Sequence, residues 1–213
     1  MKKTILFVLL FSPFFVHAQI GFKAGLNFAN VSKASSINNS SRTGFNIGLL
    51  LAPPSKKILS SRTEFTFSRQ GYNYKTSTNT GSVNLDYIML PQYMCINITK
   101  YFQIQLGAQM AFLVSATADS SKSAGSTNGS GSKILDLYNK FDYGYGGGVE
   151  IHPAAGLLIG ARVNISLGNL YKDVQNGQAP SFSSIDVKNN VFQVFAGWKF
   201  GKNESKKKKE NNE

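Results

Sequence analysis

The segment from Phe102 to Val114 most constrains what this chain can fold into, because its side chains alternate between two kinds of surface. Apolar residues, most of them large, occupy every second position, and mainly glutamine, glycine and alanine lie between them. Successive strand side chains point to opposite faces, so the pattern predicts a strand with one apolar face. Soluble strands usually span about 5–6 residues, whereas a tilted membrane strand needs about 9–11. The length favours a membrane strand, although a soluble sandwich strand can alternate in the same way.

This alternation recurs along the whole chain and predicts eight strands. They span 20–30, 42–52, 58–70, 83–98, 102–114, 141–152, 157–168 and 190–200. The connections after the second, fourth and sixth strands are short, and the other four are longer and polar. Bacterial outer-membrane barrels have an even number of strands, short periplasmic turns and longer external loops. We therefore predict an all-β, eight-stranded antiparallel up-and-down transmembrane β-barrel in the outer membrane, with periplasmic N- and C-termini.

The third and fourth predicted strands contain irregularities. Gly71 indicates a bulge, because the tyrosines that follow it fall on the opposite parity. In the fourth strand the alternation weakens after Ile88, and Pro91 predicts a local break in pairing. The apolar positions from Val83 to Cys95 are predicted to face outward. Cys95 is the single cysteine, so it forms no intrachain disulfide and is expected to be a buried or lipid-facing thiol.

The two ends of the chain differ in composition from the part between them. Residues 1–18 combine lysines, an apolar run and a small residue at Ala18, which is typical of a secretory signal peptide. A membrane anchor is the alternative, but the run is short and contains Pro13. We expect the barrel to span 19–201 and a basic, disordered periplasmic tail to span 202–213. The loop within 115–133, read alone, also resembles a flexible linker.

Three segments together resemble the PorT-like small outer-membrane β-barrel family of Bacteroidota. They are 21–29, 85–93 and 142–150, and the resemblance extends over essentially the whole chain after residue 18. It implies an eight-stranded outer-membrane barrel without a settled activity, and one named member is linked to type IX secretion. The chain departs from barrels that end on an aromatic residue, because a basic tail follows Phe200.

Charged residues of both signs fall on the parity that we assign to the barrel interior. They are Lys23, Arg42, Arg62, Glu64, Asp86, Asp142, Glu150, Arg162 and Lys199. An eight-stranded barrel is just wide enough for its side chains to fill it. One interpretation is therefore an internal network of ion pairs, and the other is a narrow conducting path lined by charge.

Catalytic chemistry has little support in the sequence. His152 is the only histidine after residue 18, and no serine or aspartate pattern around it indicates a nucleophile and a base. Asp142 and Glu150 are eight residues apart on one predicted strand, about 26 Å, which is too far for a glycosidase pair. No metal-ligand spacing or phosphate-binding loop is present. We predict no enzyme activity, no cofactor and no metal site.

The formal charge of +12 and the many aromatic residues allow two interpretations. Aromatic residues near strand ends are typical of the girdles at membrane interfaces, whereas base stacking would require a concentrated basic surface that the scattered cations do not provide. We expect lipid and lipopolysaccharide as partners, with an envelope protein as a further partner and no nucleic acid. The tail is either a solvated end or a periplasmic tether. Its cluster consists of Lys206, Lys207, Lys208 and Lys209.

Three functions remain open from the sequence. The first is a non-catalytic barrel with a structural or interaction role, either as a stand-alone barrel or as an accessory to a secretion or envelope complex. The second is a narrow channel for small solutes, and the third is a lipid-modifying enzyme. A soluble, lipocalin-like barrel is the structural alternative, and it requires an apolar interior and a polar exterior.

Overall fold

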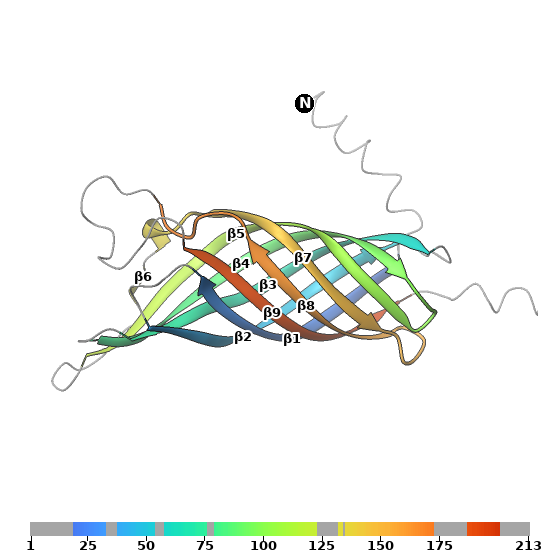
Figure 1. Ribbon diagram of the computed structural model, residues 1–213, viewed down its shortest axis with the longest axis horizontal. Helices are drawn as coiled ribbons and strands as arrows, with labels where there is room; N and C mark the ends of the chain where they lie inside the picture. Colours follow the sequence, from blue (N-terminus) through green and yellow to red (C-terminus); the bar gives the residue numbers. More distant parts are fainter. Residues whose placement is uncertain are drawn as a thin grey trace, which may run out of the picture.

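The strands form a closed barrel in the computed structural model, which describes residues 19–32, 38–53, 58–75, 79–122, 132–133, 135–172 and 187–200. The tilted strands run obliquely around a single wall (Figure 1). The predicted signal peptide and the basic tail lie outside the described residues.

Eight long strands and one very short strand make up the sheet. They are β1 (Gln19–Ser32), β2 (Asn38–Ala52), β3 (Leu59–Lys75), β4 (Asn79–Asn97), β5 (Phe102–Lys122), β6 (Ser132–Lys133), β7 (Phe141–Ile151), β8 (Leu157–Ser166) and β9 (Lys188–Lys199). The order is β4-β3-β2-β1-β9-β8-β7-β5-β6, and antiparallel pairing of β4 with β5 closes the ring. The two-residue β6 pairs only with β5 and adds nothing to the circumference. The predicted eight-stranded antiparallel barrel is therefore confirmed.

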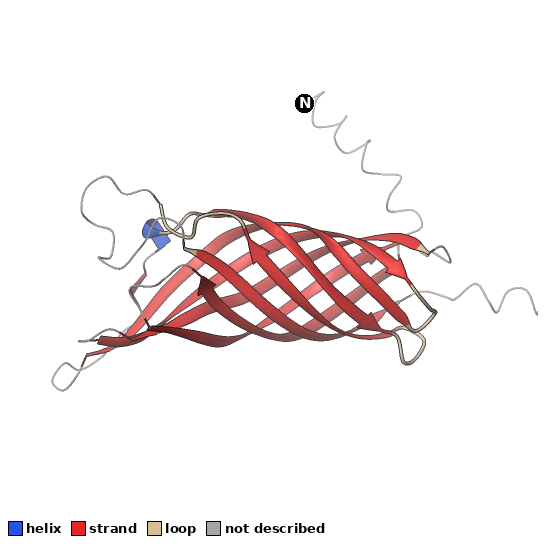
Figure 2. Cartoon of the chain, in the orientation of Figure 1, coloured by secondary structure: helices blue, strands red, loops and turns tan. Residues whose placement is uncertain are grey.

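The wall of the barrel is taller on one side than on the other. Strands β3, β4 and β5 contain 17, 19 and 21 residues, whereas β7, β8 and β9 contain 11, 10 and 12. Figure 2 shows the long strands continuing toward one end, where the short helical turn η2 (Leu135–Leu137) also lies. We call this the loop end, and we call the end with Gln19 and Phe200 the turn end.

The taller strands correct the prediction of four long connections at the loop end. β2 begins six positions after β1 ends, and β4 begins four positions after β3 ends. These two connections are as short as those at the turn end. The polar segments within 38–41, 72–75 and 79–82 are paired strands rather than loops. The outward side chains of these segments are polar, which indicates that lipid does not surround this part of the wall.

An irregularity occurs at Gly71, but the extra residue is in β2 and not in β3 as predicted. Between the two registers β2 has four residues (42–45) and β3 has three (69–71), whereas the β3–β4 ladder passes Gly71 without a shift. Tyr72 therefore keeps the inward parity of Ser68 and Gln70. The register between β2 and β3 shifts between Ser41 and Asn46, opposite this glycine. Gly71 has a φ of 147°, a conformation that a side chain rarely adopts, and a Cβ there would collide with the Val83 carbonyl oxygen. A second register shift, at Asp86 and Tyr87 of β4, faces one additional residue in β5. Both shifts occur where the wall passes from its short to its tall part.

The predicted break at Pro91 occurs on one side of β4 only. The ladder with β5 continues through the pair Pro91–Gln109. The ladder with β3 omits Glu64 and Phe65, although the register is the same on both sides of the gap. Proline has no backbone N–H to donate, so one neighbour loses its hydrogen bond.

Large apolar side chains cover the outside of the barrel. Ile47 and Leu49 are 56% and 55% exposed. Near the loop end, three phenylalanine pairs cross adjacent strands: Phe28–Phe192, Phe45–Phe67 and Phe112–Phe141, with ring centroids 6.2, 5.8 and 5.4 Å apart. Exposed aromatic residues also gather at the turn end, at Phe22, Tyr101, Trp198 and Phe200. This exterior contradicts the lipocalin-like alternative, which requires a polar outer face.

Candidate functional site: the filled barrel interior

The candidate site is the barrel interior, where the inward side chains form three layers along the axis. A charged layer lies in the turn-end half, an amide-rich layer follows it, and an apolar layer fills the loop end. The inward parity of β1, β3 and β5 supplies most of the polar groups. We describe the layers in that order.

Glu64 is the centre of the charged layer. Its carboxylate lies 2.6 Å from Lys23 Nζ and 3.0 Å from Arg162 Nη1, and Arg62 Nη1 lies 3.9 Å away. The four side chains come from β1, β3 and β8, and all are almost completely buried. Since three cations contact one carboxylate, Glu64 holds the layer together electrostatically.

A second carboxylate completes the charged layer on the opposite wall. Both terminal nitrogens of Arg62 donate to Glu150, at 2.6 and 2.7 Å. The side chain of Gln105 also donates to Glu150, at 2.9 Å, and accepts a hydrogen bond from Arg162. His152 Nε2 lies 3.1 Å from the same carboxylate at the turn-end rim. The layer thus contains three cations and two carboxylates, linked by neutral amides.

Aromatic rings pack against the cations of this layer. The Arg162 guanidinium lies 3.9 Å from the Tyr93 ring centroid and 4.9 Å from that of Phe195. Lys23 Nζ also lies 4.9 Å from the Phe195 centroid. Such contacts stabilise a buried cation without a further counter-charge.

The structure brings together five of the nine predicted interior charges, namely Lys23, Arg62, Glu64, Glu150 and Arg162. Lys199 lies near this group and interacts electrostatically with Arg62 and Glu150. Asp142 is remote from it, because it begins β7 near the loop end, where it accepts a hydrogen bond from Ser166 Oγ at 2.5 Å. The predicted interior position of Arg42 is wrong, because its side chain donates to Asn84 and Asn73, which lie on the outward parity of β4 and β3.

The predicted interior position of Asp86 is wrong, and so is the predicted outward face of its strand, β4. The alternating apolar residues from Val83 to Cys95 are buried and point inward, so Asp86 lies on the outer side of β4. It pairs with Arg69, whose Nε and Nη2 donate to the two carboxylate oxygens at 2.7 and 2.9 Å. The prediction failed because both faces of this strand carry apolar residues over part of its length.

The middle layer is made of amides and hydroxyls. Asn27 donates to Ser68 Oγ at 2.9 Å and accepts from Asn46 at 2.8 Å. Gln70 donates to Ser68 at 2.9 Å and accepts from Asn189 at 2.5 Å. These bonds connect the inward side chains of β3, β2, β1 and β9, which follow one another in the sheet.

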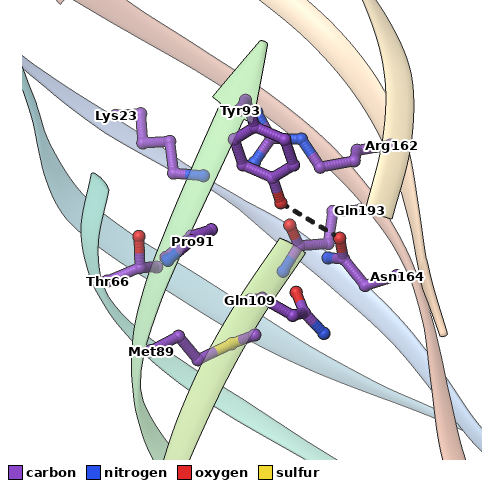
Figure 3. A pocket seen from close by; sticks show the side chains of 9 residues that line it. All are labelled: Lys23, Thr66, Met89, Pro91, Tyr93, Gln109, Arg162, Asn164 and Gln193. Atoms are coloured by element: carbon purple, nitrogen blue, oxygen red, sulfur yellow. Dashed lines mark hydrogen bonds between the residues drawn. The ribbon is translucent and has the colours of Figure 1, made fainter. Parts of the chain in front are cut away.

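A narrow pocket lies where the charged layer meets the middle layer (Figure 3). Lys23 and Arg162 lie on one side of it and Met89 on the other, and Tyr93 donates to Asn164 across it at 3.2 Å. The gaps between these atoms are too narrow to hold a water molecule. The pocket is a packing gap rather than a ligand cavity.

The loop end of the interior is closed by an apolar plug. Its buried members are Val31, Tyr72, Val83, Leu85, Tyr87, Met89, Ala111, Leu113, Ala116, Tyr138, Leu170, Tyr171 and Val187. The hydroxyl of Tyr72 bonds to those of Tyr138 and Tyr171, at 3.1 and 2.5 Å. Burial raises the pKa of Tyr138 and Tyr171. The plug therefore fastens the segments that precede β7 and follow β8 to the tall wall.

Sequence reasoning missed the partners that complete these layers. Gln103 and Gln105 were recognised as the polar face of their strand, but not as ligands of Arg62, Arg162 and Glu150. Tyr138 and Tyr171 lie outside the alternating segments, so no periodic signal indicated them. Within the described ranges, no three histidine, cysteine, aspartate or glutamate side chains gather as a metal site. No helix in that part of the chain could span a membrane.

The fold and its exterior define a class of protein. A closed antiparallel barrel with an apolar, aromatic-girdled outside and a polar inner layer is a transmembrane β-barrel of the bacterial outer membrane. The family model described as "Outer membrane protein beta-barrel domain" matches residues 16–172, and the chain belongs to this family. A comparison with curated protein sequences gave no significant match.

Several solved outer-membrane barrels are similar to this chain at low identity. The attachment invasion locus protein Ail of Yersinia pestis is 17% identical, with 87% of this chain and 100% of Ail covered and a TM-score of 0.49. Neisserial surface protein A is 15% identical, with 85% and 97% covered and a TM-score of 0.49. OprG of Pseudomonas aeruginosa is 12% identical, with 87% and 98% covered and a TM-score of 0.38.

Proposed function

We propose that this protein is a closed, non-conducting and non-catalytic barrel with a structural or interaction role in the outer membrane. The observation that carries this proposal is the stacking of a charged layer and an apolar plug in one interior. The sequence resemblance to the PorT-like family favours an accessory role in a secretion or envelope complex. In this proposal the turn end, with Gln19 and Phe200, faces the periplasm.

Each layer opposes conduction for a different reason. A permeating ion would have to break contacts of 2.6–3.0 Å between buried charges, which leaves charges unpaired. It would then have to cross the apolar plug, whose described side chains are mostly apolar and replace little of an ion's hydration shell. Both barriers lie in series along one axis.

A narrow channel is the second candidate, and planar bilayer recordings test it directly. We expect the purified, refolded barrel to give no conductance steps above background. Reproducible ohmic steps from the intact protein would overturn the proposal of a closed barrel. A lipid-modifying enzyme predicts altered lipid A in cells that overproduce the protein, and we expect unchanged lipid A.

The interaction role is tested by co-purification from gently solubilised outer membranes. The full chain is compared with a chain that ends at Lys202, which lacks the basic cluster 206–209. A stoichiometric partner that is lost with the tail supports an accessory subunit tethered through those lysines. The same lone, heat-modifiable barrel from both chains rules out the tether.

A further inference from the structure

A polar cluster on the outer face of β2, β3 and β4 lies where the apolar exterior ends at the loop end. In the β3–β4 ladder, Phe67 pairs with Ile88, and the outward position one step further pairs Arg69 with Asp86. The exterior therefore changes from apolar to charged within one outward step, about 7 Å along the strands. In a membrane barrel, such a step marks the level of the lipid headgroups.

Arg69 contacts both a charged and an aromatic neighbour at this level of the wall. It forms the two hydrogen bonds to Asp86 described above, and its side chain is 43% exposed whereas that of Asp86 is 12% exposed. Its guanidinium also lies 5.5 Å from the centroid of Phe45, which pairs with Phe67. The cation thus lies over the Phe45 ring, with part of its surface exposed.

Arg42 lies beside this pair and has neutral partners. Its Nε donates to Asn84 Oδ1 at 2.7 Å, and its Nη1 donates to Asn73 Oδ1 at 3.1 Å. Asn84 and Asp86 are two positions apart on β4, so the two guanidinium groups bind acceptors about 7 Å apart. Two arginines and one carboxylate give this cluster a charge of +1. Further toward the loop end, the exposed Lys75 and Asp119 have opposite charges.

We propose that Arg42 and Arg69 bind the phosphate groups of a phosphorylated glycolipid of the outer leaflet. The acyl chains of this lipid would lie on Phe45, Phe67 and the apolar wall below them. Guanidinium groups match phosphate oxygens in geometry and charge, and two of them at this spacing suit a headgroup that carries more than one phosphate. The inference rests on the proposed function, because it places the loop end on the outer side of the membrane.

Native mass spectrometry of the folded, detergent-solubilised full chain tests this site. The protein is titrated with diphosphorylated lipid A, with dephosphorylated lipid A and with phosphatidylglycerol. We expect the diphosphorylated lipid to bind most tightly, and Arg42→Gln and Arg69→Gln each to weaken its binding about fivefold. Lys100→Gln is the matched control, because this lysine lies 4.7 Å from the Tyr101 ring at the turn end.

Asp86→Asn separates recognition from structural damage, since it raises the cluster charge from +1 to +2. We expect this variant to bind the diphosphorylated lipid about fivefold more tightly, which a damaged barrel would not do. Equal binding of the phosphorylated and dephosphorylated lipids, or unchanged binding in all three variants of the cluster, would overturn the proposal. Equal binding of phosphatidylglycerol would overturn the choice of a glycolipid.

A failure of the lipid titration can be distinguished from a failure of the proposed function. Heat-modifiable migration in electrophoresis shows whether each variant is a folded barrel. Binding in detergent does not depend on which end of the barrel faces outward. A failed titration with an intact, non-conducting barrel therefore removes the lipid site alone.

Discussion

Replacing Glu64 by glutamine is expected to lower the free energy of unfolding by about 3–5 kcal/mol, the usual cost of breaking a buried ion pair. Glu64 contacts Lys23, Arg62 and Arg162, all almost completely buried. The wild-type layer has three cations and two carboxylates, a charge of 3 − 2 = +1, and the variant has 3 − 1 = +2. The amide keeps the shape of the side chain, so the loss measures charge rather than packing.

The assay is reversible urea unfolding of the barrel in lipid vesicles, followed by the fluorescence of Trp198. This residue is the only tryptophan of the chain, and it lies exposed on the outer wall at the turn end. Its emission therefore reports the transfer of the strand from lipid to water. Lys100→Gln is the control, because it removes a charge at the rim and should change the unfolding free energy by less than about 0.5 kcal/mol.

A double variant tests whether charge balance is the cause. Lys23→Met together with Glu64→Gln returns the layer to 2 − 1 = +1, and we expect it to be more stable than Glu64→Gln alone. Contacting charges are coupled, so the two changes should not be additive. If Glu64→Gln unfolds at the same urea concentration as the wild type with the same slope, the charged layer is not a stabilising element.

Two further predictions follow from the loop end. Gly71→Ala should lower the free energy of unfolding by about 1–3 kcal/mol because of its φ of 147° and the nearby Val83 carbonyl. Gly147→Ala should be tolerated, because its one close contact is the flexible end of the Leu106 side chain and the Gln105 carbonyl lies at an ordinary 3.5 Å. Equal losses in urea unfolding would refute the argument. Tyr138 and Tyr171 should ionise at higher pH than free tyrosine, because burial raises their pKa in the folded state only. Above pH of about 10 the unfolded chain loses these protons first, so stability should be constant below that pH and fall above it. Near-ultraviolet absorbance of tyrosinate measures this, and ionisation of every tyrosine near pH 10 in the folded barrel would contradict it.

Much of the fold was predictable because most strands have an apolar face toward the outside of the barrel and a polar face toward its interior. In β1 and β5 the outward residues are apolar and the inward ones are lysine, asparagine and glutamine over the turn-end half, so parity alone gives the face. In β4 the same reasoning failed. Tyr87 and Met89 point into the apolar plug, and Ile88 and Leu90 point outward. When both faces of a strand are apolar, the alternation of side chains does not show which face points inward.

The sequence indicated nine interior charges, but it did not show which five of them meet in the charged layer. Parity places a residue inside or outside, but it does not say how far along the axis the residue lies. Asp142 has the inward parity of Glu150 and still lies near the other end of β7, with Ser166 as its partner. The height of each residue depends on strand stagger and on the two register shifts, which involve pairing between distant segments. A single sequence carries little information about either.

The reversal of polarity along the tall wall has a consequence for the order of assembly. Toward the turn end the wall is apolar outside and polar within, but β3 and β4 beyond the register shifts are polar outside and cover the apolar plug, as in a water-soluble protein. The two parts are therefore stable in different solvents. In the proposed orientation, the polar strand tips must first pass through the bilayer before Tyr72, Tyr138 and Tyr171 can meet in water. Membrane insertion thus precedes closure of the plug, and an unfinished barrel would cross the membrane with its loop end still open.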